Sequence, residues 1–581
     1  MMKNQLSWKV GGQQGEGIES TGEIFSVALN RMGYHLYGYR HFSSRIKGGH
    51  TNNKIRVSTT PTRAISDDLD ILVAFDQETI DLNVHELSDQ GIVIADSKFK
   101  PKLPDGVSGT LYAVPFTEIA DELGSSLMKN MVAVGASAAA LSLDITPFED
   151  VVQRIFQRKG DKIVQMNIDA LHKGAEYFAH EANGQVDHLK LEQGDGQQRM
   201  YMIGNDAIAL GALAAGCRFM AAYPITPSSE IMEYLIKKLP EFGGTVIQTE
   251  DEIAAITMSI GANYAGVRAF TASAGPGLSL MTEGIGLAGM TETPVVIVDT
   301  QRGGPSTGLP TKQEQSDMNA LIYSTHGEIP KIVLAPGTAE EAFYDTIEAF
   351  NLAEEYQCPV IIAADLALAL GKQTVEPLDY DKIEIRRGKL LDAVPEYEGD
   401  LFKRFEVTED GISPRVIPGL TQAITHATGV EHGENGRPSE DPANRKAQMD
   451  KRLRKLNNFK YKQALNIHAP YERPELLIVG VGSTIGPIAE AQQRLEKAGH
   501  KVNHVQTRIL HPFPTEEIRP FVEAADQVVV VENNATGQLA NLLKLHVGHA
   551  DKINNILKYD GNPFLPGEIE QRALEHIKEL V

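Results

Sequence analysis

Residues 218–230, RFMAAYPITPSSE, decide the fold class of the central part of the chain. The apolar run 218–222 is typical of a buried β-strand, and a turn rich in Pro and Ser separates it from a segment of helical length. Three further strands are predicted at residues 245–248, 267–271 and 294–299, the last of which runs into a Gly-rich loop. Strands that alternate with helices in this way indicate an α/β fold with a parallel sheet.

The composition of the 581 residues limits the possible classes of function. With 42% hydrophobic and 23% charged residues it is ordinary for a globular protein, and the length suggests roughly three to five domains. Lys plus Arg is 55 against 77 Asp plus Glu, a net charge of −22, which argues against a nucleic-acid partner. No apolar run reaches the length of about 18 that spans a membrane, and the N-terminus lacks the apolar segment of a signal peptide. We therefore expect a cytoplasmic protein without a membrane partner.

The two cysteines, Cys217 and Cys358, are far apart in the sequence. Two are too few for a disulfide framework, for a four-thiolate zinc site or for a cysteine-ligated iron–sulfur cluster within this chain. Any redox metal centre is therefore expected in another chain, and no metal ligands are assigned in this one.

Five segments are predicted along the chain from changes in composition and pattern. They are an α/β unit with a parallel sheet (1–183), a polar linker (184–200), the central α/β unit (201–375), a charged connecting region punctuated by Pro and Gly (376–470) and a last α/β unit (471–581). Within the connecting region the basic run 446–455 has a helical pattern, and we interpret it as a solvated helix face.

A Gly-rich turn near the N-terminus, Gly11-Gly12-Gln13-Gln14-Gly15-Glu16-Gly17, lies between a predicted strand and a predicted helix. Backbone NH groups at such a turn can hold an anion, and Gly12, Gly15 and Gly17 would let it approach. The spacing is not that of the dinucleotide-binding fingerprint, so a tight structural turn is the simpler interpretation and a ligand loop the alternative. A second loop sets Arg45 and Lys47 beside a Gly pair, and it too is either a turn or a phosphate site.

The polar segments that follow the central strands have structural interpretations when each is taken singly. Thr226 is expected to cap a helix that has Pro227 in its first turn. Thr249 and Glu252 have the spacing of a capping box. For Arg302, a solvated loop position is the simplest interpretation.

Taken together, the four segments favour a functional site. In an open parallel α/β sheet, ligands bind outside the carboxyl ends of the strands, and all four segments leave that edge. A hydroxyl from Thr226, the carboxylate of Glu252, the turn Ser273-Ala-Gly-Pro-Gly and the guanidinium of Arg302 are therefore expected in one crevice.

These segments strongly resemble the α subunit of 2-oxoacid:ferredoxin oxidoreductases. The motifs are Tyr223-Pro-Ile-Thr-Pro-Ser-Ser-Glu, Glu250-Asp-Glu-Ile-Ala-Ala, Thr271-Ala-Ser-Ala-Gly-Pro-Gly and Gln301-Arg-Gly-Gly-Pro-Ser-Thr-Gly. Residues 1–183 look like the family's γ domain fused ahead of α, and 471–581, with Val529-Val-Val-Glu-Asn-Asn-Ala-Thr-Gly-Gln-Leu, are similar to the transketolase C-terminal domain. The resemblance covers nearly the whole chain. It implies a multidomain α/β protein with a γ-type domain, a thiamine-diphosphate pyrimidine-binding domain and a transketolase C-terminal-like domain.

The resemblance also implies thiamine diphosphate, whose aminopyrimidine N1′ needs a carboxylic acid. The family's glutamate falls on Glu252, with Glu250 as the alternative if the register slips by two residues. The other cofactor-binding residues that the resemblance implies are Tyr223, Pro224, Ser273 and Gly275.

The substrate end of the site is implied in the same way. Thr226 and Arg302 match family positions that hold the 2-oxo and carboxylate end of a 2-oxoacid, and a guanidinium suits a carboxylate because it can pair with both oxygens. For the second carboxylate of 2-oxoglutarate, Lys312 or a residue of a partner chain is expected to supply a cation. Coenzyme A is an implied co-substrate, and the loops around Gly12 to Gly17 and around Arg45 and Lys47 are candidates for it by physical type only.

The diphosphate end of the cofactor is expected in another chain. Gly194-Asp195-Gly196 spells the start of the thiamine-diphosphate magnesium motif, but the Asn pair that completes it does not follow, so we interpret it as a chance match. The resemblance then implies that Mg²⁺ and a [4Fe-4S] cluster belong to a β subunit, that the cofactor is shared at the interface of an α₂β₂ complex, and that ferredoxin accepts the electrons.

The expected function is therefore the coenzyme A-dependent oxidative decarboxylation of a 2-oxoacid. The segments Asp410-Gly-Ile-Ser-Pro-Arg and Glu440-Asp-Pro-Ala-Asn-Arg look most like the 2-oxoglutarate branch, whose product is succinyl-CoA. Two alternatives stay open. One is the same chemistry on pyruvate or on a branched or aryl 2-oxoacid, and the other is a non-catalytic nucleotide-binding assembly subunit.

Overall fold

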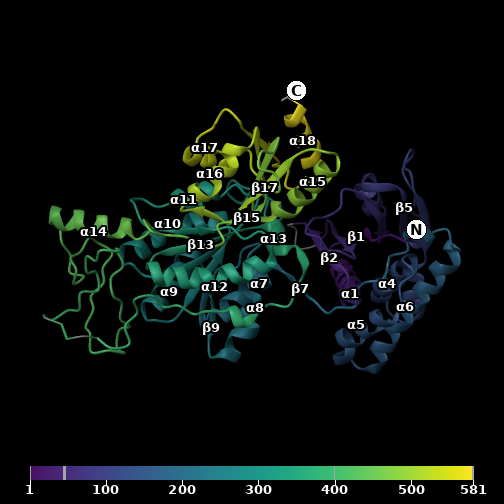
Figure 1. Ribbon diagram of the computed structural model, residues 1–581. Coiled ribbons are helices and arrows are strands. Elements are labelled where there is room, and N and C mark those ends of the chain that lie inside the picture. Colours follow the sequence, from purple (N-terminus) through teal and green to yellow (C-terminus); the bar gives the residue numbers. More distant parts are fainter. Residues whose placement is uncertain (1, 44–47, 395, 398, 579–581) are drawn as a thin grey trace. The chain divides into compact units, whose positions relative to one another are not determined.

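The structure is a computed structural model that describes residues 2–43, 48–394, 396–397 and 399–578 (Figure 1). Its contacts divide the chain into two compact units. Unit 1 is the chain up to Met202 together with Leu370–Pro377 and Leu565–Gly567, and unit 2 is the remainder. The finer division into five segments stays a prediction.

Unit 1 is built on an eight-stranded sheet. Its order is β6 (Thr110–Val114), β5 (Leu87–Asp96), β4 (Leu69–Ala74), β1 (Gln5–Gln13), β3 (His50–Ser58), β2 (His35–His41), β14 (Lys372–Val375) and β7 (Met200–Ile203). The neighbouring strands β6, β5, β4 and β1 are parallel, but β1 pairs antiparallel with β3, β3 with β2 and β2 with β14. The parallel sheet expected for residues 1–183 is therefore wrong: the sheet is mixed, because consecutive strands such as β2 and β3 pair antiparallel without a crossover helix.

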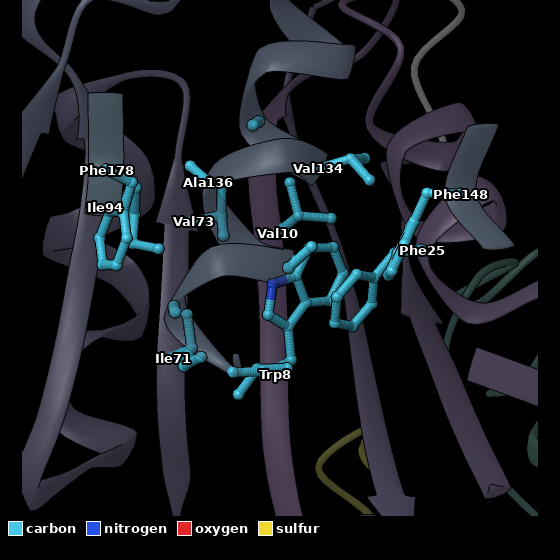
Figure 2. Packing of buried hydrophobic residues seen from close by; sticks show 14 of the residues in the cluster. Trp8, Val10, Phe25, Ile71, Val73, Ile94, Val134, Ala136, Phe148 and Phe178 are labelled. Carbon is cyan, nitrogen blue, oxygen red and sulfur yellow. The ribbon is translucent and has the colours of Figure 1, made fainter. Parts of the chain in front are cut away.

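The core of unit 1 lies between this sheet and the helices α1 (Ile18–Arg31), α4 (Lys129–Ala140) and α6 (Asp161–Ala182). Figure 2 shows Trp8 of β1 stacked on Phe25 of α1, with ring centroids 4.2 Å apart. The indole Nε1 of Trp8 donates a 3.0 Å hydrogen bond to Ser137 Oγ, so its one polar atom is satisfied inside the core.

The Ala- and Gly-rich helix α4 packs backbone to backbone against α6. A Cβ at Gly135 would collide with the carbonyl oxygen of Leu171, and one at Gly174 with that of Val132. Glycine at both positions is what lets the two helices approach so closely. Among the residues described, no helix is long and apolar enough to cross a membrane.

Unit 2 contains the sheet expected around residues 218–230. Its order is β18 (Ile509–His511), β12 (Ile332–Leu334), β13 (Pro359–Asp365), β11 (Val295–Gln301), β10 (Ala269–Ser273), β8 (Phe219–Ala222) and β9 (Thr245–Gln248). The six strands from β12 to β9 are parallel, which confirms the predicted α/β class. The helices α8 (Ser229–Lys238), α9 (Glu252–Tyr264) and α10 (Gly275–Met290) follow β8, β9 and β10.

A second sheet of unit 2 is formed by the C-terminal residues. Its order is β15 (Leu465–His468), β17 (Val502–Thr507), β16 (Leu476–Val481), β19 (Gln527–Glu532) and β20 (Ile553–Leu557). Strand β18, which follows β17 in the chain, pairs antiparallel with β12 of the central sheet. One hydrophobic cluster contains residues of both sheets, including Ile297, Leu510 and Val530. The two sheets therefore share a core.

The connecting region is mostly irregular and contains the helix α14 (Pro442–Arg454). The expectation of a solvated basic face is wrong for Lys451, Arg452 and Lys455, which are buried, whereas Lys446 of the same run is exposed. Lys451 and Lys455 lie 2.6 and 2.7 Å from the carboxylate of Glu292, which follows α10. Arg452 pairs with Glu431 at 2.6 Å. Lys451 and Lys455 thus tie the region to the end of α10, and Arg452 forms an ion pair within the region.

A second buried carboxylate anchors the same region. Glu354, on α12 (Ala339–Tyr356), forms ion pairs with Arg268, Arg387 and Arg415 at 3.0, 2.6 and 2.8 Å. Two of these cations come from the connecting region. An otherwise irregular segment is thus fixed by charge pairs whose partners lie in regular structure.

Candidate functional site

The carboxyl edge of the central sheet collects the four polar segments. β11, β10, β8 and β9 are neighbours in that order, so the segments after them lie side by side. The register pairs Ser273 with Asp299 and Ala222 with Gln248 at this edge. The four segments therefore share one edge of the sheet, as expected, and their meeting in one crevice stays a prediction.

Glu252 is the first residue of α9, and its side chain is largely buried at this edge. The helix is capped by Asp251, whose side chain accepts a 2.7 Å hydrogen bond from the amide of Ala254. The capping box of Thr249 and Glu252 is not formed, because the Thr249 hydroxyl donates to the carbonyl of Asp251 instead. Glu252 is only 6% exposed, whereas Glu250 in the preceding turn is exposed. No residue within the described ranges forms a hydrogen bond to the Glu252 carboxylate.

The start of α10 closes on this carboxylate. A Cβ at Gly277 would lie 2.6 Å from Glu252 Oε1 and would collide with Ser273 Oγ. The Ser273 hydroxyl is buried and, within the part of the chain that is described, has no hydrogen-bond partner. A free carboxylate and a free hydroxyl thus meet beside a helix N-terminus. This arrangement can hold a polar group of a ligand, and it fits the aminopyrimidine of thiamine diphosphate, which needs a carboxyl partner.

Arg302 follows β11 and touches the Thr226 segment. Its Nη1 donates a 2.6 Å hydrogen bond to the carbonyl oxygen of Thr226, and its Nη2 donates to that of Thr307 at 3.3 Å. Nε has no partner among the residues described, and the side chain is 6% exposed. Burial lowers the pKa of Arg302, against the opposing effect of Asp317. A guanidinium without a carboxylate partner is suited to bind an anionic ligand.

The turn after β8 differs from the helix start expected there. The Thr226–Pro227 peptide bond is cis, and α8 begins at Ser229 with Ser228 at its N-cap position. Thr226 is therefore not the N-cap, and Pro227 is not in the first turn of the helix. The Thr226 carbonyl is instead turned toward Arg302, which accounts for their contact.

Two buried carboxyl groups at the same edge were missed by the sequence reasoning. Both oxygens of Asp299 and one of Asp317 are buried without a partner in the described residues. Burial and the neighbouring Asp317 raise the pKa of Asp299, and burial together with Glu314 raises that of Asp317 to about 6. Asp317 lies against the first residue of α10, since a Cβ at Gly275 would be 2.6 Å from its Oδ2. The available signal was an acid at the end of an apolar run, where Asp299 follows residues 294–298.

The remaining predicted residues of this site lie at the same edge. Tyr223 is exposed, Pro224 and Gly275 are partly buried, and Lys312 lies on the loop that follows Arg302. The Lys312 carbonyl accepts a 3.1 Å hydrogen bond from the amide of Gly303. The roles assigned to these residues stay predictions.

The N-terminal turn of unit 1 is filled by the chain's own carboxylate. Glu16 Oε2 accepts a 3.1 Å hydrogen bond from the amide of Gln13, and Glu16 Oε1 lies 2.8 Å from Lys129 Nζ. Gly17 has φ 82°, and a Cβ there would collide with the Asn130 amide. These contacts give the spacing Gly12, Gly15, Gly17 a structural explanation. The anion-loop interpretation is not tested, and Arg45 and Lys47 lie outside the described residues.

The chain's potential metal ligands are dispersed. Asp195 of the chance motif pairs with Arg199 at 2.6 Å. Cys217 and Cys358 are both buried, and burial raises the pKa of each thiol to about 12. Within the described ranges, no three residues among His, Cys, Asp and Glu form a group that could hold a metal ion.

Three family models match the chain. The model described as "Pyruvate flavodoxin/ferredoxin oxidoreductase, thiamine diP-bdg" covers residues 210–451, which include Glu252 and Arg302. "Pyruvate ferredoxin/flavodoxin oxidoreductase" covers residues 7–177, and "Pyruvate:ferredoxin oxidoreductase core domain II" covers 474–569. The residues that form the candidate site therefore belong to a thiamine-diphosphate-binding domain.

Individual proteins are similar over the whole length. The 2-oxoacid:ferredoxin oxidoreductase subunit alpha of a Sulfolobus species is 36% identical, over 99% of this chain and 97% of its own. The 2-oxoglutarate synthase subunit KorA of Methanothermobacter thermautotrophicus is 37% identical, over 65% of this chain and 99% of its own. The structure of 2-oxoglutarate:ferredoxin oxidoreductase from Magnetococcus marinus, with 2-oxoglutarate, coenzyme A and succinyl-CoA bound, is 35% identical with a TM-score of 0.92. That comparison covers 99% of this chain and 100% of the other.

Proposed function

Since this chain belongs to the family of 2-oxoacid:ferredoxin oxidoreductase α subunits, we propose that its substrate is 2-oxoglutarate. In the proposed reaction, 2-oxoglutarate and coenzyme A give succinyl-CoA and CO₂. The two electrons released pass to ferredoxin, and the thiol proton of coenzyme A is released to solvent. The naming of one relative as a 2-oxoglutarate synthase subunit and of a similar structure as a 2-oxoglutarate enzyme supports this choice among 2-oxoacids.

The observation that carries the proposal is the Glu252 side chain, which is 6% exposed and whose carboxylate has no hydrogen-bond partner among the described residues. When bound, thiamine diphosphate supplies the nucleophilic carbon and the electron sink that decarboxylation of a 2-oxoacid requires. Glu252 would hold a proton at its carboxyl oxygen, facing the aminopyrimidine ring, as a general acid in a site shielded from water. Ser273 would hold the same ring edge, since its hydroxyl meets Glu252 beside Gly277.

Thr226 and Arg302 would bind the reacting end of the substrate. The carbonyl oxygens of Thr226 and Thr307 fix the position of the guanidinium. Its Nε and the remaining NH donors of its terminal nitrogens would bind the carboxylate of the substrate. Lys312, on the same loop, would face the distal carboxylate of 2-oxoglutarate. A substrate with only one carboxylate would not use that cation.

A β subunit would cover the cofactor from outside this chain. Large apolar side chains are exposed on both helices: Ile253 of α9 is 53% exposed and Leu280 of α10 52%, with Met258 beside Ile253, although Glu283 of α10 is exposed as well. Exposed apolar side chains near Glu252 would suit a surface that another protein covers. We assign Mg²⁺, the cofactor's diphosphate and a [4Fe-4S] cluster to that subunit, in an α₂β₂ complex that reduces ferredoxin.

Co-expression with a β subunit tests the proposal. The partner should carry the complete diphosphate motif and four cysteines, and the purified complex should be brown and should reduce ferredoxin with 2-oxoglutarate, coenzyme A and thiamine diphosphate. Steady-state rates on 2-oxoglutarate, pyruvate and branched or aryl 2-oxoacids then rank the substrates. A preference for a monocarboxylate would overturn the 2-oxoglutarate assignment. Tight nucleotide binding by the chain, with no effect of thiamine diphosphate, would instead favour the assembly-subunit alternative.

A further inference from the structure

The loop that carries Arg302 is closed on itself. The Leu309 amide donates to the carbonyl of Gly303 at 2.8 Å, and the Gly303 amide donates to that of Lys312 at 3.1 Å. We call residues 302–314 the Arg302 loop. Because Thr307 of this loop accepts a hydrogen bond from Arg302, the conformation of the loop determines where the guanidinium lies.

The downstream end of the Arg302 loop is held by the C-terminal sheet through Gln315. The Gln315 amide donates to the carbonyl of Asn533 at 2.7 Å, and its side-chain oxygen accepts from the Asn533 amide at 3.0 Å. Its side-chain nitrogen donates to Asp365 at 2.7 Å and to the carbonyl of Val481 at 2.9 Å. Gln315 is 1% exposed. One buried amide thus joins the ends of β13, β16 and β19.

Gln538, at the start of α17 (Gln538–Val547), holds the adjoining residues. Its side-chain Nε2 donates to the carbonyl of Ser316 at 2.7 Å, and its side-chain Oε1 accepts from the backbone amide of Asn319 at 2.8 Å. Asp317, between these two contacts, donates from its own amide to Gln301 at 3.0 Å. Gln301 directly precedes Arg302. The hydrogen bond between Asp317 and Gln301 therefore links the start of the Arg302 loop to the residues that Gln538 holds at its end.

The sequence motif 529–539 contains the residues that hold the end of the Arg302 loop. Glu532 of the motif accepts hydrogen bonds from the backbone amides of Leu539 and of the following Ala540 at 2.8 and 3.1 Å, and from the side chain of Asn534 at 2.6 Å. These bonds fix the turn between β19 and α17. The other side of the turn presents Asn533, Asn534 and Gln538 to residues 315–319.

We propose that Gln315 is a positioning residue for the reaction, through which the C-terminal sheet holds the Arg302 loop in the geometry that binds the 2-oxoacid. Within the part of the chain that the structure describes, no carboxylate lies within ion-pair distance of Arg302, so the loop and the Thr226 carbonyl supply its fixed contacts. Loosening the loop would therefore misplace the guanidinium without touching Glu252. The inference rests on the proposed function, because its kinetic test needs turnover of a 2-oxoacid.

The test uses Gln315→Met in the reconstituted complex, with Gln538→Met as a second variant in case the first does not fold. We expect the KM for the 2-oxoacid to rise about tenfold with kcat nearly unchanged, as when an interaction common to ground and transition state is lost. Hydrogen exchange at the amides of Gly303, Leu309 and Lys312 should become faster in the same variants, a readout that needs no activity.

Asp345→Asn is the matched control. Asp345 pairs with Arg508 at 2.5 Å, another buried contact between α12 and the C-terminal residues, and it lies outside the Arg302 loop. The control should lower the melting temperature but leave the KM and the exchange of the loop amides as in the wild type. An equal rise of KM in the control, or an unchanged KM and exchange in a folded Gln315 or Gln538 variant, overturns the inference. Absence of 2-oxoacid turnover in the wild-type complex would count against the proposed function, while unchanged exchange of the loop amides would count against the inference.

Discussion

The ammonium of Lys451 lies 2.6 Å from the carboxylate of Glu292, and both side chains are completely buried. The two residues come from the irregular connecting region and from the central unit, and Lys455 shares the same carboxylate. A single carboxylate therefore pairs with two buried lysines, and the Arg404 guanidinium donates to the backbone carbonyl of the same residue.

Glu292→Gln should strongly destabilise the protein, because it leaves buried lysines without a counter-charge. We expect the free energy of unfolding to fall by about 3–5 kcal/mol in urea titrations. Asp450→Asn is the control, since Asp450 pairs with Lys446 on the exposed side of the same helix and such pairs contribute about 0–1 kcal/mol. Similar losses in the two variants would contradict the assignment of Glu292 as the anchor.

Acid should release this anchor only at very low pH. Burial alone would raise the pKa of Glu292, but Lys455, Lys451 and Arg404 outweigh it and hold the pKa at about 2. With a folded pKa below the ordinary 4.5, the carboxylate's contribution to stability is complete above pH 4.5 and is lost as the pH falls through about 2. Unfolding measured across that range should therefore show a pH-dependent step that Glu292→Gln lacks.

Glu252→Gln should abolish turnover of the complex and leave its assembly intact, because the amide cannot donate a carboxyl proton. We expect a loss of about 10²–10⁴-fold in kcat. Sedimentation of the complex monitors assembly. Glu250→Gln, two residues earlier on the exposed turn, is the control and should keep wild-type kcat; loss of activity there alone would move the role to Glu250.

Gly277→Ala should disturb the meeting of Glu252 and Ser273. The added methyl would lie 2.6 Å from Glu252 Oε1, and overpacking of this kind costs about 1–3 kcal/mol of stability. At Gly286, on the same helix, a Cβ meets no atom within 4 Å, so Gly286→Ala should stabilise the isolated chain by about 0.5–1 kcal/mol. Thermal unfolding of the two variants gives the comparison, and shifts of the same sign would contradict it.

Asp317→Asn should stabilise the protein at alkaline pH. Burial raises the pKa of Asp317 to about 6, Glu314 adding to the shift and Arg302 opposing it. Its favourable contribution is therefore complete below about pH 3.8 and is lost as the pH rises through about 6. The amide avoids that loss, so we expect a gain of up to about 3 kcal/mol at pH 8 that shrinks toward pH 4. A gain independent of pH would show that the carboxyl's charge is not its cause.

The central sheet was predictable because its signals are local. Each strand is a short apolar run followed by turn residues, and the parallel order then brings Glu252 and Arg302 to one edge. The sequence predicted that Arg302 and Thr226 lie at the same edge of the sheet. The form of their contact was not predictable, because the spacing of residues does not tell which atom of Thr226 accepts the hydrogen bond from Arg302.

Features that depend on distant partners were not predictable from patterns. The helix α14 has the charge pattern of a solvated face, and the buried Lys451 has its counter-charge in Glu292, far earlier in the sequence. Asp251 rather than Thr249 caps α9, a choice between neighbouring acceptors that spacing alone does not decide. Asp317 acquires its raised pKa from burial, which becomes visible only once the loop is folded.

Strand β14 belongs to the sheet of unit 1, although the chain forms most of the central sheet of unit 2 before reaching it. During translation, the edge of β2 therefore stays unpaired until β14, which ends at Val375, has left the ribosome. At the usual pace of about 5–20 residues per second, the nascent sheet carries an open edge for many seconds. This interval is when a chaperone, or a misplaced strand from another copy, could compete for β2.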